Sequence, residues 1–442
     1  MIKLPEQVNK AICLLKSSGF EAYAVGGAVR DCLLGKVPFD WDITTSARPE
    51  ETEKVFCGER IIETGIKHGT VTVIIDGMPL EITTYRIDGD YTDHRHPQTV
   101  SFSDNLRDDL SRRDFTINTL CCNCDDKIID VFGGKDDLKN KTIRCVGDPD
   151  TRFSEDALRI MRAVRFSAEL GFKIEKSTSD SILKNRQLLS DVSKERLQVE
   201  FTKLITGKHA TDVIRKYHAV IEVFIPELAP LAECEQHTKY HKYDVFEHTL
   251  HAVDAIDFND RILRLTMFFH DFGKPDAKTT DENGTSHFKG HAVISEKKTR
   301  DILKRLKFDN NTINEVSKLV LIHDMKSPRD KIQAKKMMCS LGDEAYLNLI
   351  KIKRADNMAK ADPHAIDEKL KNMRSFYEEI KASNECYNLK SLAVNGDDIK
   401  AFGIAEGKEI KSSLDFLLNG VIEGKCQNRK DVLLEYLKEN TK

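Results

Sequence analysis

Two short segments near the start of the chain carry residues whose types and spacing suit phosphate and metal chemistry. Gly26 and Gly27 end a short apolar run, and Asp40 and Asp42 flank Trp41 a little further along. Backbone N–H groups of paired glycines beside a helix start can hold a phosphate. Carboxylates two residues apart on a strand point the same way and repel each other, which favours a bound Mg²⁺ or Mn²⁺. The pattern indicates phosphoryl or nucleotidyl transfer, and a glycine turn beside a solvated acidic strand end is the plainer alternative.

The elements that must position these residues are short strands and one short helix. Apolar runs predict a strand over residues 22–25, a helix over 28–34 that ends at Gly35, and a strand over 39–44. Further strand patterns cover residues 60–63, 71–76, 80–85, 99–102 and 127–131. Residues 1–150 therefore predict a mixed sheet with its carboxylates at one edge.

Two further groups of polar residues lie in this region. Glu81 sits inside an apolar strand pattern and is a candidate third carboxylate, although a surface glutamate on an edge strand fits equally well. Arg112 and Arg113 suit a triphosphate, and the nearby Asp114 and Asn118 suit ribose hydroxyls. An ordinary charged turn would contain the same residue types.

Composition places the chain among globular proteins of a reducing compartment. Its 442 residues are 40% hydrophobic and 32% charged, and this length favours roughly three domains. No apolar run is long enough for a transmembrane helix, and residues 1–20 favour a helix over a signal peptide. The odd count of 11 cysteines indicates the cytoplasm. Because the net charge is only −3, any nucleic-acid-binding surface must be local.

Several longer motifs follow one another along about half of the chain. They are AVGGAVRD (24–31), FDWDITTSARPEE (39–51), the loop around 88–97, DDLSRRDFTIN (108–118), DVFGGKDDL (130–138), IRCVGDP (143–149), RFSEDALRIMRAVRFSAELGF (152–172) and SKERLQVEF (193–201). In these motifs the chain resembles the class II nucleotidyltransferase family, the bacterial CCA-adding enzymes and poly(A) polymerases. So many motifs in the family's order make a chance match untenable.

The resemblance implies roles for individual positions. Asp40 and Asp42 match the family's metal ligands. The positions that match its nucleotide-binding motifs are Gly26, Gly27, Arg30, Arg112, Arg113, Asp114, Asn118, Glu155, Asp156, Arg159 and Arg162. Among them, Glu155, Asp156 and Arg159 match the motif that reads the incoming base. One helical turn separates Arg159 from the two carboxylates, so one helix face would present all three to cytosine or adenine, and a surface ion pair is the alternative.

A second constellation of candidate metal ligands occurs beyond residue 237. His-Asp dipeptides close two apolar helical runs there, which is costly to bury unless they bind something. The candidate ligands are His248, His270, Asp271, His291, His323 and Asp356. Their spacing resembles the metal-dependent HD phosphohydrolase domain over about residues 237–360, which implies Mn²⁺, Fe²⁺, Ni²⁺ or Mg²⁺, with enough ligands for two metals. The neighbouring His237, His241, His251 and His287 are interpreted as ordinary core or surface histidines.

The patterns and the resemblance together predict an α+β fold. A small mixed-sheet nucleotidyltransferase head, polymerase β-like by resemblance, covers residues 1–150. An all-α region follows, with a neck that carries the base-selection helix (151–236), the HD domain (237–360) and a Lys-rich tRNA-contacting tail (361–442). A solvated packing domain is the alternative for the tail.

The resemblance implies template-independent addition of C, C and A to the 3′ end of tRNA from CTP and ATP. Mg²⁺ ions on Asp40 and Asp42 would serve this transfer in a two-metal mechanism that releases pyrophosphate. A transition metal such as Mn²⁺ or Ni²⁺ would serve a second, phosphohydrolase activity in the HD domain. The expected partners are tRNA, CTP and ATP, without a membrane, and the oligomeric state stays open.

Three alternatives to this activity stay open. A poly(A) polymerase and a partial adder of CC or A alone would share nearly all the residues named, although the loop at 88–97 argues against CC-only addition. From a different class, the chain would be an RNA-end phosphohydrolase or a tRNA-binding protein with an inactive transferase. Both aspartates and the Arg-Arg-Asp motif argue against that class.

Overall fold

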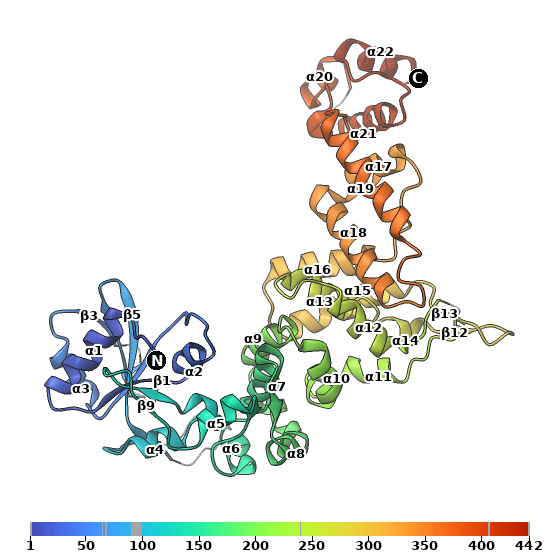
Figure 1. The fold of residues 1–442 in the computed structure, drawn as a ribbon. Helices are drawn as coiled ribbons and strands as arrows, with labels where there is room; N and C mark the ends of the chain where they lie inside the picture. The colour runs from blue at the N-terminus through green and yellow to red at the C-terminus, as the bar shows by residue number, and fades with distance from the viewer. Residues whose placement is uncertain are drawn as a thin grey trace. The chain divides into compact units, whose positions relative to one another are not determined.

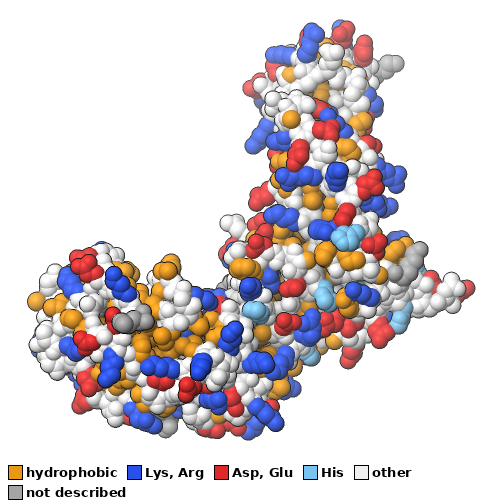
Figure 2. All heavy atoms as spheres, in the orientation of Figure 1, with side chains coloured by type: hydrophobic (Ala, Val, Ile, Leu, Met, Phe, Trp, Pro, Cys, Tyr) orange, Lys and Arg blue, Asp and Glu red, His pale blue; other side chains and the backbone are white. Residues whose placement is uncertain are grey.

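The computed structural model describes residues 2–63, 65–66, 69–89, 100–238, 240–404 and 407–440. From residue 90 onward, the predicted loop at 88–97 lies outside the described residues. The chain divides into two compact units, Met1–Ala229 and Pro230–Lys442, which are described separately. Across the described part of the chain, no helix is both long and apolar enough to span a membrane. Basic and acidic side chains are interspersed over the face drawn in Figure 2.

A seven-stranded mixed sheet forms the base of the first unit (Figure 1). Its order is β3-β4-β5-β2-β1-β8-β9, in which β2 and β5 are parallel and the other neighbours antiparallel. The strands are β1 (Ala22–Val25), β2 (Asp42–Thr45), β3 (Arg60–Ile62), β4 (Thr70–Ile75), β5 (Met78–Thr84), β8 (Cys121–Cys122) and β9 (Ile128–Ile129). Outside this sheet, β6 (Arg86–Asp88) pairs with β7 (Val100–Phe102), and β10 (Thr142–Ile143) with β11 (Lys173–Ile174).

Most strands of the sheet lie where the sequence patterns predict them, but β8 was not predicted, and the predicted strand at 99–102 is β7, which pairs outside the sheet. The predicted strand over 39–44 begins three residues later, at Asp42, so Asp40 precedes β2. The alternation nevertheless holds, because Trp41 and Ile43 are buried whereas Asp40 and Asp42 are exposed. Helices α1 (Glu6–Ser17) and α3 (Pro49–Val55) pack on the sheet, and α1 buries the apolar stripe that includes Ile12 and Leu15.

The rest of the first unit is helical. Its other helices are α2 (Gly27–Leu33), α4 (Leu106–Ser111), η2 (Thr116–Asn118), α5 (Gly134–Lys139), α6 (Pro149–Glu155), α7 (Leu158–Leu170), α8 (Lys176–Asn185), η3 (Arg186–Asp191), α9 (Lys194–Ile205), α10 (Ala210–Ile221) and η4 (Pro226–Leu228). Helix α7 buries Ile160, Met161 and Val164 and ends at Gly171, whose φ of 69° suits a residue without Cβ. This confirms the α+β fold class predicted from the sequence.

The described second unit is helical except for the hairpin of β12 (Thr279–Thr280) and β13 (Ser286–His287). Its helices are α12 (Val245–Asp254), α13 (Arg261–Phe269), α14 (Lys274–Ala277), α15 (His291–Arg305), α16 (Asn310–Ile322), α17 (Lys331–Leu341), α18 (Asp343–Met358), α19 (Asp367–Ala382), η5 (Leu389–Ser391), α20 (Gly396–Ala401), α21 (Lys408–Ile422) and α22 (Lys430–Asn440). The short α11 (Ala229–Ala232) lies at the division between the units. In the tail, the Asn395 side chain caps helix α20.

One buried ion pair joins helices α7 and α9. Arg165 Nε donates to Glu200 Oε2 at 2.6 Å, and both side chains are buried. Arg165 also donates to Glu169 at 2.8 Å, but that carboxylate is partly exposed. Glu200→Ala leaves a buried guanidinium without its main counter-charge, and we expect a loss of about 3 kcal/mol in the unfolding free energy of the first unit.

The matched control uses the same arginine. Glu169→Ala removes the solvent-accessible partner and should cost less than about 1 kcal/mol. Urea unfolding followed by circular dichroism measures both. If both variants lost the same unfolding free energy, burial would not explain the strength of the Arg165–Glu200 pair.

Candidate active site

The two sequence-predicted aspartates lie on the wall of one cavity. Asp40 and Asp42 line a hollow of about 740 Å³ in the first unit. Strand β2 lies between β1 and β5, so Asp42 is opposite Val25 on one side and Glu81 on the other. The end of β1 brings Gly26 beside Asp42, because Gly26 directly follows Val25. The glycine pair and the carboxylate pair therefore lie at the same end of the central strands β1 and β2.

The electrostatics of Asp42 indicate a missing positive charge. The surrounding protein removes water from its carboxylate and raises the pKa to about 6, although Arg113 opposes this change. The carboxylates of Glu81 and Asp40 raise the pKa further. Two carboxylates at a cavity wall that disfavour each other's charge form a donor set that fits a hard divalent cation.

Glu81 stands next to this pair but outside the cavity lining. It is an exposed residue of β5, in register with Asp42. Its carboxylate influences the pKa of Asp42, so the two are electrostatically coupled. A role as third metal ligand stays a prediction.

Gly26 lies beside both the Arg113 guanidinium and the Asp42 carboxylate. Its φ is +83°, and a Cβ built on it would lie 3.2 Å from Arg113 Nη1 and 3.8 Å from Asp42 Oδ2. A side chain here would therefore fill the space in which Arg113 and Asp42 approach each other. Gly27 and Arg112 line the same cavity, and Arg112 is held by Asp109, with Nη2 2.6 Å from Oδ1.

A network around the buried Asp114 carboxylate shapes the opposite wall. Arg162 Nε donates to Asp114 Oδ2 at 2.8 Å, and Asn118 Nδ2 donates to Asp114 Oδ1 at 2.9 Å. Asn118 Oδ1 in turn accepts from Arg30 Nη1 at 2.8 Å. Burial alone would raise the pKa of Asp114, but Arg162 and these hydrogen bonds hold it at about 2. The charged carboxylate thus fixes three elements, α2, η2 and α7, around the cavity.

Guanidinium groups surround one aromatic ring in this wall. Phe166 has Arg165 at 3.9 Å, Arg30 at 4.9 Å and Arg162 at 5.3 Å from its ring centroid. Cation–π contacts allow several like charges to share a small volume. The cavity therefore presents a dense positive field, which suits a polyphosphate.

The predicted base-reading residues do not share one helix face. Helix α6 ends at Glu155, Asp156 is extended (φ −134°, ψ 101°), and α7 begins at Leu158, so the continuous turn assumed from the sequence is wrong. Arg159 Nη1 still bonds Glu155 Oε2 at 2.7 Å, while Asp156 pairs with Arg196 at 3.0 Å. Asp156 and Arg159 line the cavity, whereas Glu155 is not among its lining residues.

Several residues that line the cavity were not among the predicted site residues. They are Asp31, Phe39, Arg165, Phe166, Glu169 and Lys203. Arg165 and Phe166 lie in the motif at 152–172, but no site role was predicted for them. Their position at the cavity depends on how α7 packs against α9, which sequence patterns do not show.

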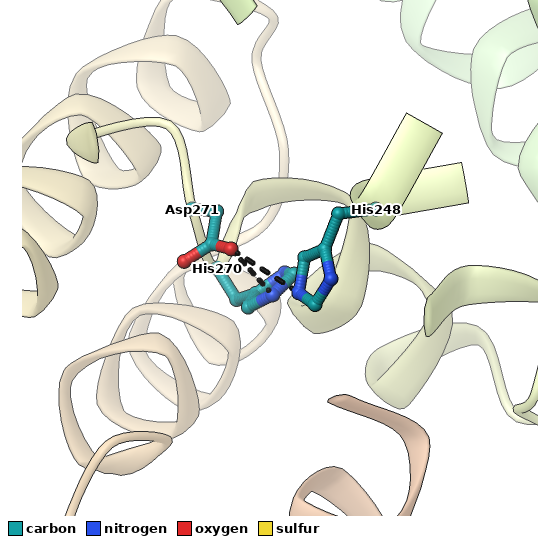
Figure 3. A group of neighbouring side chains, drawn as sticks. All are labelled: His248, His270 and Asp271. Carbon is teal, nitrogen blue, oxygen red and sulfur yellow. Dashed lines mark ion pairs between the residues drawn. The ribbon is translucent and has the colours of Figure 1, made fainter. Parts of the chain in front are cut away.

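The second constellation assembles in the second unit. Figure 3 shows the side chains of His248, from α12, and of His270 and Asp271, which follow α13, pointing toward one another. Asp271 Oδ2 lies 3.1 Å from His270 Nε2 and 3.4 Å from His248 Nε2. Asp356 Oδ1, on α18, is 3.0 Å from His248 Nε2. All three residues in the figure are fully or almost fully buried.

The remaining two histidines lie around the other oxygen of Asp271. Asp271 Oδ1 is 3.4 Å from His291 Nε2 and 3.8 Å from His323 Nε2. One carboxylate is therefore shared by two groups of histidines, each compact enough for a metal ion. The structure brings together all six predicted ligands of this region.

Backbone carbonyl groups orient the rings of His291 and His323 in the way that is typical of metal-binding histidines. The Nδ1 atoms of His291 and His323 face the carbonyl oxygens of Phe288 and Val320 at 2.8 and 2.6 Å, so in the neutral rings the proton is on Nδ1. Their Nε2 atoms face each other at 3.0 Å, and burial lowers the pKa of His323 to about 3. Two facing acceptors require a shared proton or a cation. His270 Nε2 is likewise buried without a well-formed hydrogen bond, so the donor set fits a metal.

Three polar residues of this centre were not predicted. The His241 ring packs 5.1 Å from that of His248, and its buried Nδ1 has no hydrogen-bond partner, unlike an ordinary surface histidine. Lys274 Nζ lies 2.7 Å from Asp271 Oδ2, and Lys360 Nζ 2.5 Å from Asp356 Oδ2. These residues line a cavity of about 310 Å³ over the cluster.

Paired aspartates beside an arginine-lined cavity on a mixed sheet define a nucleotidyltransferase head, and comparison with known families agrees. Residues 22–144 match the family described as "Poly A polymerase head domain", residues 171–231 the "Probable RNA and SrmB- binding site of polymerase A", and residues 279–437 the "tRNA nucleotidyltransferase domain 2 putative". Membership in such a family implies use of a divalent metal ion.

Relatives that match along almost the whole chain show which family of nucleotidyltransferases it belongs to. Proteins named CCA-adding enzyme from Lactobacillus helveticus and Geobacillus kaustophilus are 33% and 34% identical over 99% of this chain and 98% and 97% of theirs. The crystal structure of the Bacillus stearothermophilus CCA-adding enzyme in complex with CTP is 30% identical, with a TM-score of 0.72 over 98% of this chain and 96% of that one. The chain belongs to the CCA-adding enzyme family, which confirms the family resemblance, whereas the HD resemblance stays a prediction.

The Asp114 network predicts a pH-dependent contribution to stability. The pKa of Asp114 is about 2 in the fold and about 3.9 when unfolded, so its ionised form stabilises the fold by about 2 kcal/mol above about pH 4. This contribution is lost as the pH falls from about 4 toward about 2. Asp114→Asn lacks the titration, so the stability gap between wild type and variant should narrow between about pH 5.5 and about pH 3 in urea unfolding. A gap that stays constant over this range would contradict the assigned pKa.

Proposed function

We propose that this protein adds C, C and A to the 3′ end of tRNA, using CTP and ATP and no template. The observation that carries the proposal is the union of two features in one cavity: the Asp40–Asp42 pair and the guanidinium groups around Phe166. The full-length relatives named CCA-adding enzyme, and the CTP complex of one of them, support the substrates. We place this activity in the cytoplasm, as the cysteine content suggests.

The reaction is an in-line displacement at phosphorus. The oxygen of the RNA 3′-hydroxyl attacks the α-phosphorus, the bond to the bridging oxygen of the β-phosphate breaks, and pyrophosphate leaves. Asp40 and Asp42 would hold Mg²⁺, which supplies charge stabilisation for the attacking and leaving oxygens. Arg112 and Arg113 bind the triphosphate, and the opening above Gly26 allows it to approach closely.

Base selection falls to Asp156 and Arg159. Both line the nucleotide cavity, and Arg159 is held there by the carbonyl oxygens of Arg112 and Arg152 at 2.7 and 3.1 Å. Glu155 does not line the cavity, but its carboxylate pairs with Arg159 and Arg152 and so helps to hold Arg159 in position. Donors fixed in this way can distinguish the Watson–Crick edges of bases without a template.

The four predicted segments receive roles within this proposal. Residues 1–150 hold the metal and triphosphate, and residues 151–236 select the base. Residues 237–360 form the HD centre, and residues 361–442 contact tRNA. The tail has its own apolar core around Ile399, Leu417 and Leu433, which allows its surface to serve binding.

Transcripts of tRNA that end at the discriminator base, at C or at CC test the reaction. Each is incubated with CTP, ATP or both, and the products are resolved to single nucleotides. We expect growth to stop at CCA when both nucleotides are present. Continued growth with ATP would indicate a poly(A) polymerase, and a stop at CC with both nucleotides a partial adder.

Asp42→Asn removes one charge from the carboxylate pair while keeping its shape. Nucleotide addition should fall by at least about a hundredfold, because the lost charge stabilises the transferring phosphoryl group. The unfolding temperature should change little, since Asp42 is exposed at the cavity wall. Asp212→Asn, an exposed aspartate on α10, is the matched control and should retain full activity. Undiminished addition by Asp42→Asn would refute the metal assignment.

A second function belongs to the histidine cluster. We propose that His248, His270, Asp271, His291, His323 and Asp356 bind one or two transition metals such as Mn²⁺ or Ni²⁺. The facing Nε2 atoms of His291 and His323, 3.0 Å apart, support this, because two acceptors at this distance need a shared proton or a cation between them. A metal here would supply an activated water for hydrolysis of phosphoesters, such as 2′,3′-cyclic phosphates at RNA ends.

Metal content gives the direct test of this centre. The double variant His270→Ala, Asp271→Ala should lose the Mn²⁺ or Ni²⁺ that wild type retains after dialysis, and with it phosphodiesterase activity, while CCA addition persists. His251→Ala is the matched control on the same helix, because His251 stacks on Tyr243 at 4.4 Å and should not affect metal content. Equal metal content in wild type and the double variant would contradict the proposal.

A further inference from the structure

A second cavity adjoins Asp40, and no arginine is among the described residues that line it. It has a volume of about 640 Å³ and shares Asp40 and Phe39 with the nucleotide cavity. Met78 and Pro79, at the start of β5, form part of its wall, and Lys3 and Lys36 also line it. In contrast to the nucleotide cavity, most of its lining comes from apolar residues.

Two apolar side chains at this site are almost completely exposed. Phe39 is 103% exposed and Val37 is 95% exposed, in the loop that leads to Asp40. An aromatic ring that packs on nothing, next to a proposed metal ligand, loses the burial that normally stabilises it. Such a ring is suited to contact a ligand.

We propose that this cavity binds the base of the 3′-terminal nucleotide of the RNA, with the Phe39 ring stacked on that base. This inference rests on the proposed function, and it assigns the subsite of the second substrate. In an in-line displacement, the attacking oxygen enters opposite the leaving pyrophosphate. The arginines mark the pyrophosphate side, so the RNA end must approach Asp40 from the other side, where this cavity opens.

The chemistry of the cavity suits an RNA terminus better than it suits the nucleoside triphosphate. Lys3 and Lys36 supply positive charge for one or two backbone phosphates, far less than a triphosphate requires. The cavity reaches the reaction centre through Phe39 and Asp40, which it shares with the nucleotide cavity.

Stacking also explains why an aromatic residue serves here. The terminal base of the RNA changes as nucleotides are added, from the discriminator base to cytosine, so its subsite must accept several bases. Every base has a π-face, and stacking on an aromatic ring tolerates sequence change in a way that hydrogen-bond readout does not. Phe39 would thus accept any terminal base of the RNA, whereas Asp156 and Arg159 would select the base of the incoming nucleotide.

The test compares Phe39→Ala with wild type on two acceptors, a tRNA transcript ending in C and the same transcript with an abasic 3′-terminal nucleotide. We expect Phe39→Ala to lower kcat/KM for the ordinary transcript about tenfold and to leave the KM for CTP unchanged. On the abasic transcript the two proteins should be equal, because the stacking partner is gone. Phe39→Trp should restore the rate, and Phe258→Ala, an exposed phenylalanine of the second unit, should have no effect.

A binding measurement accompanies the rates. With 2-aminopurine as the terminal base, wild type should quench its fluorescence on binding and Phe39→Ala should quench it less. A Phe39→Ala defect of equal size on both acceptors, or no defect on either, would overturn the inference. A wild-type protein that adds no nucleotide would instead refute the proposed function, so the two failures are distinguishable.

Discussion

The buried carboxylate of Asp114 is the interaction on which the nucleotide cavity depends. It accepts hydrogen bonds from Arg162 of α7 and from Asn118 of η2, and Asn118 accepts one from Arg30 of α2. Without this anion, arginines of two helices that share one aromatic ring would repel each other, and the wall would open. Asp114, together with Asp31 beside Arg30 and Glu200 beside Arg165, therefore balances the arginines of this wall before a triphosphate enters.

Features that depend on local sequence could be predicted, whereas features that depend on contacts between distant residues could not. The glycine pair, Asp40, Asp42 and the strands were predictable because each depends on local periodicity and chain direction. The break between α6 and α7 was not, because Asp156 leaves the helix to pair with Arg196, 40 residues away. Glu155 and Arg159 meet as an i,i+4 pair would, so the local spacing was right while the assumed helix was wrong.

In the second unit, the residue types were predictable but their orientation was not. His-Asp pairs at the ends of apolar helices indicated a metal centre, and α13 and α16 do end immediately before His270 and His323. Which ring nitrogen faces inward depends on carbonyl groups at the helix ends, such as that of Val320, and sequence patterns do not show these contacts. His241 and Lys274 escaped notice because a lone histidine or lysine is ordinarily structural.

Both sites gather carboxylates, but they differ in how deeply these are buried and in which groups balance their negative charge. In the head, Asp40 and Asp42 lie at an open cavity wall, where removal of water and the nearby Glu81 and Asp40 carboxylates raise the pKa of Asp42. The protein offers few ligands there, so a bound cation would need further ligands from the triphosphate. In the cluster, Asp271 is buried among histidines, and Lys274 and Lys360 balance its charge and that of Asp356. An open carboxylate pair suits a metal that arrives and leaves with substrate, whereas an enclosed imidazole set suits a resident metal. The proposed division between Mg²⁺ and a transition metal therefore follows from burial and ligand type.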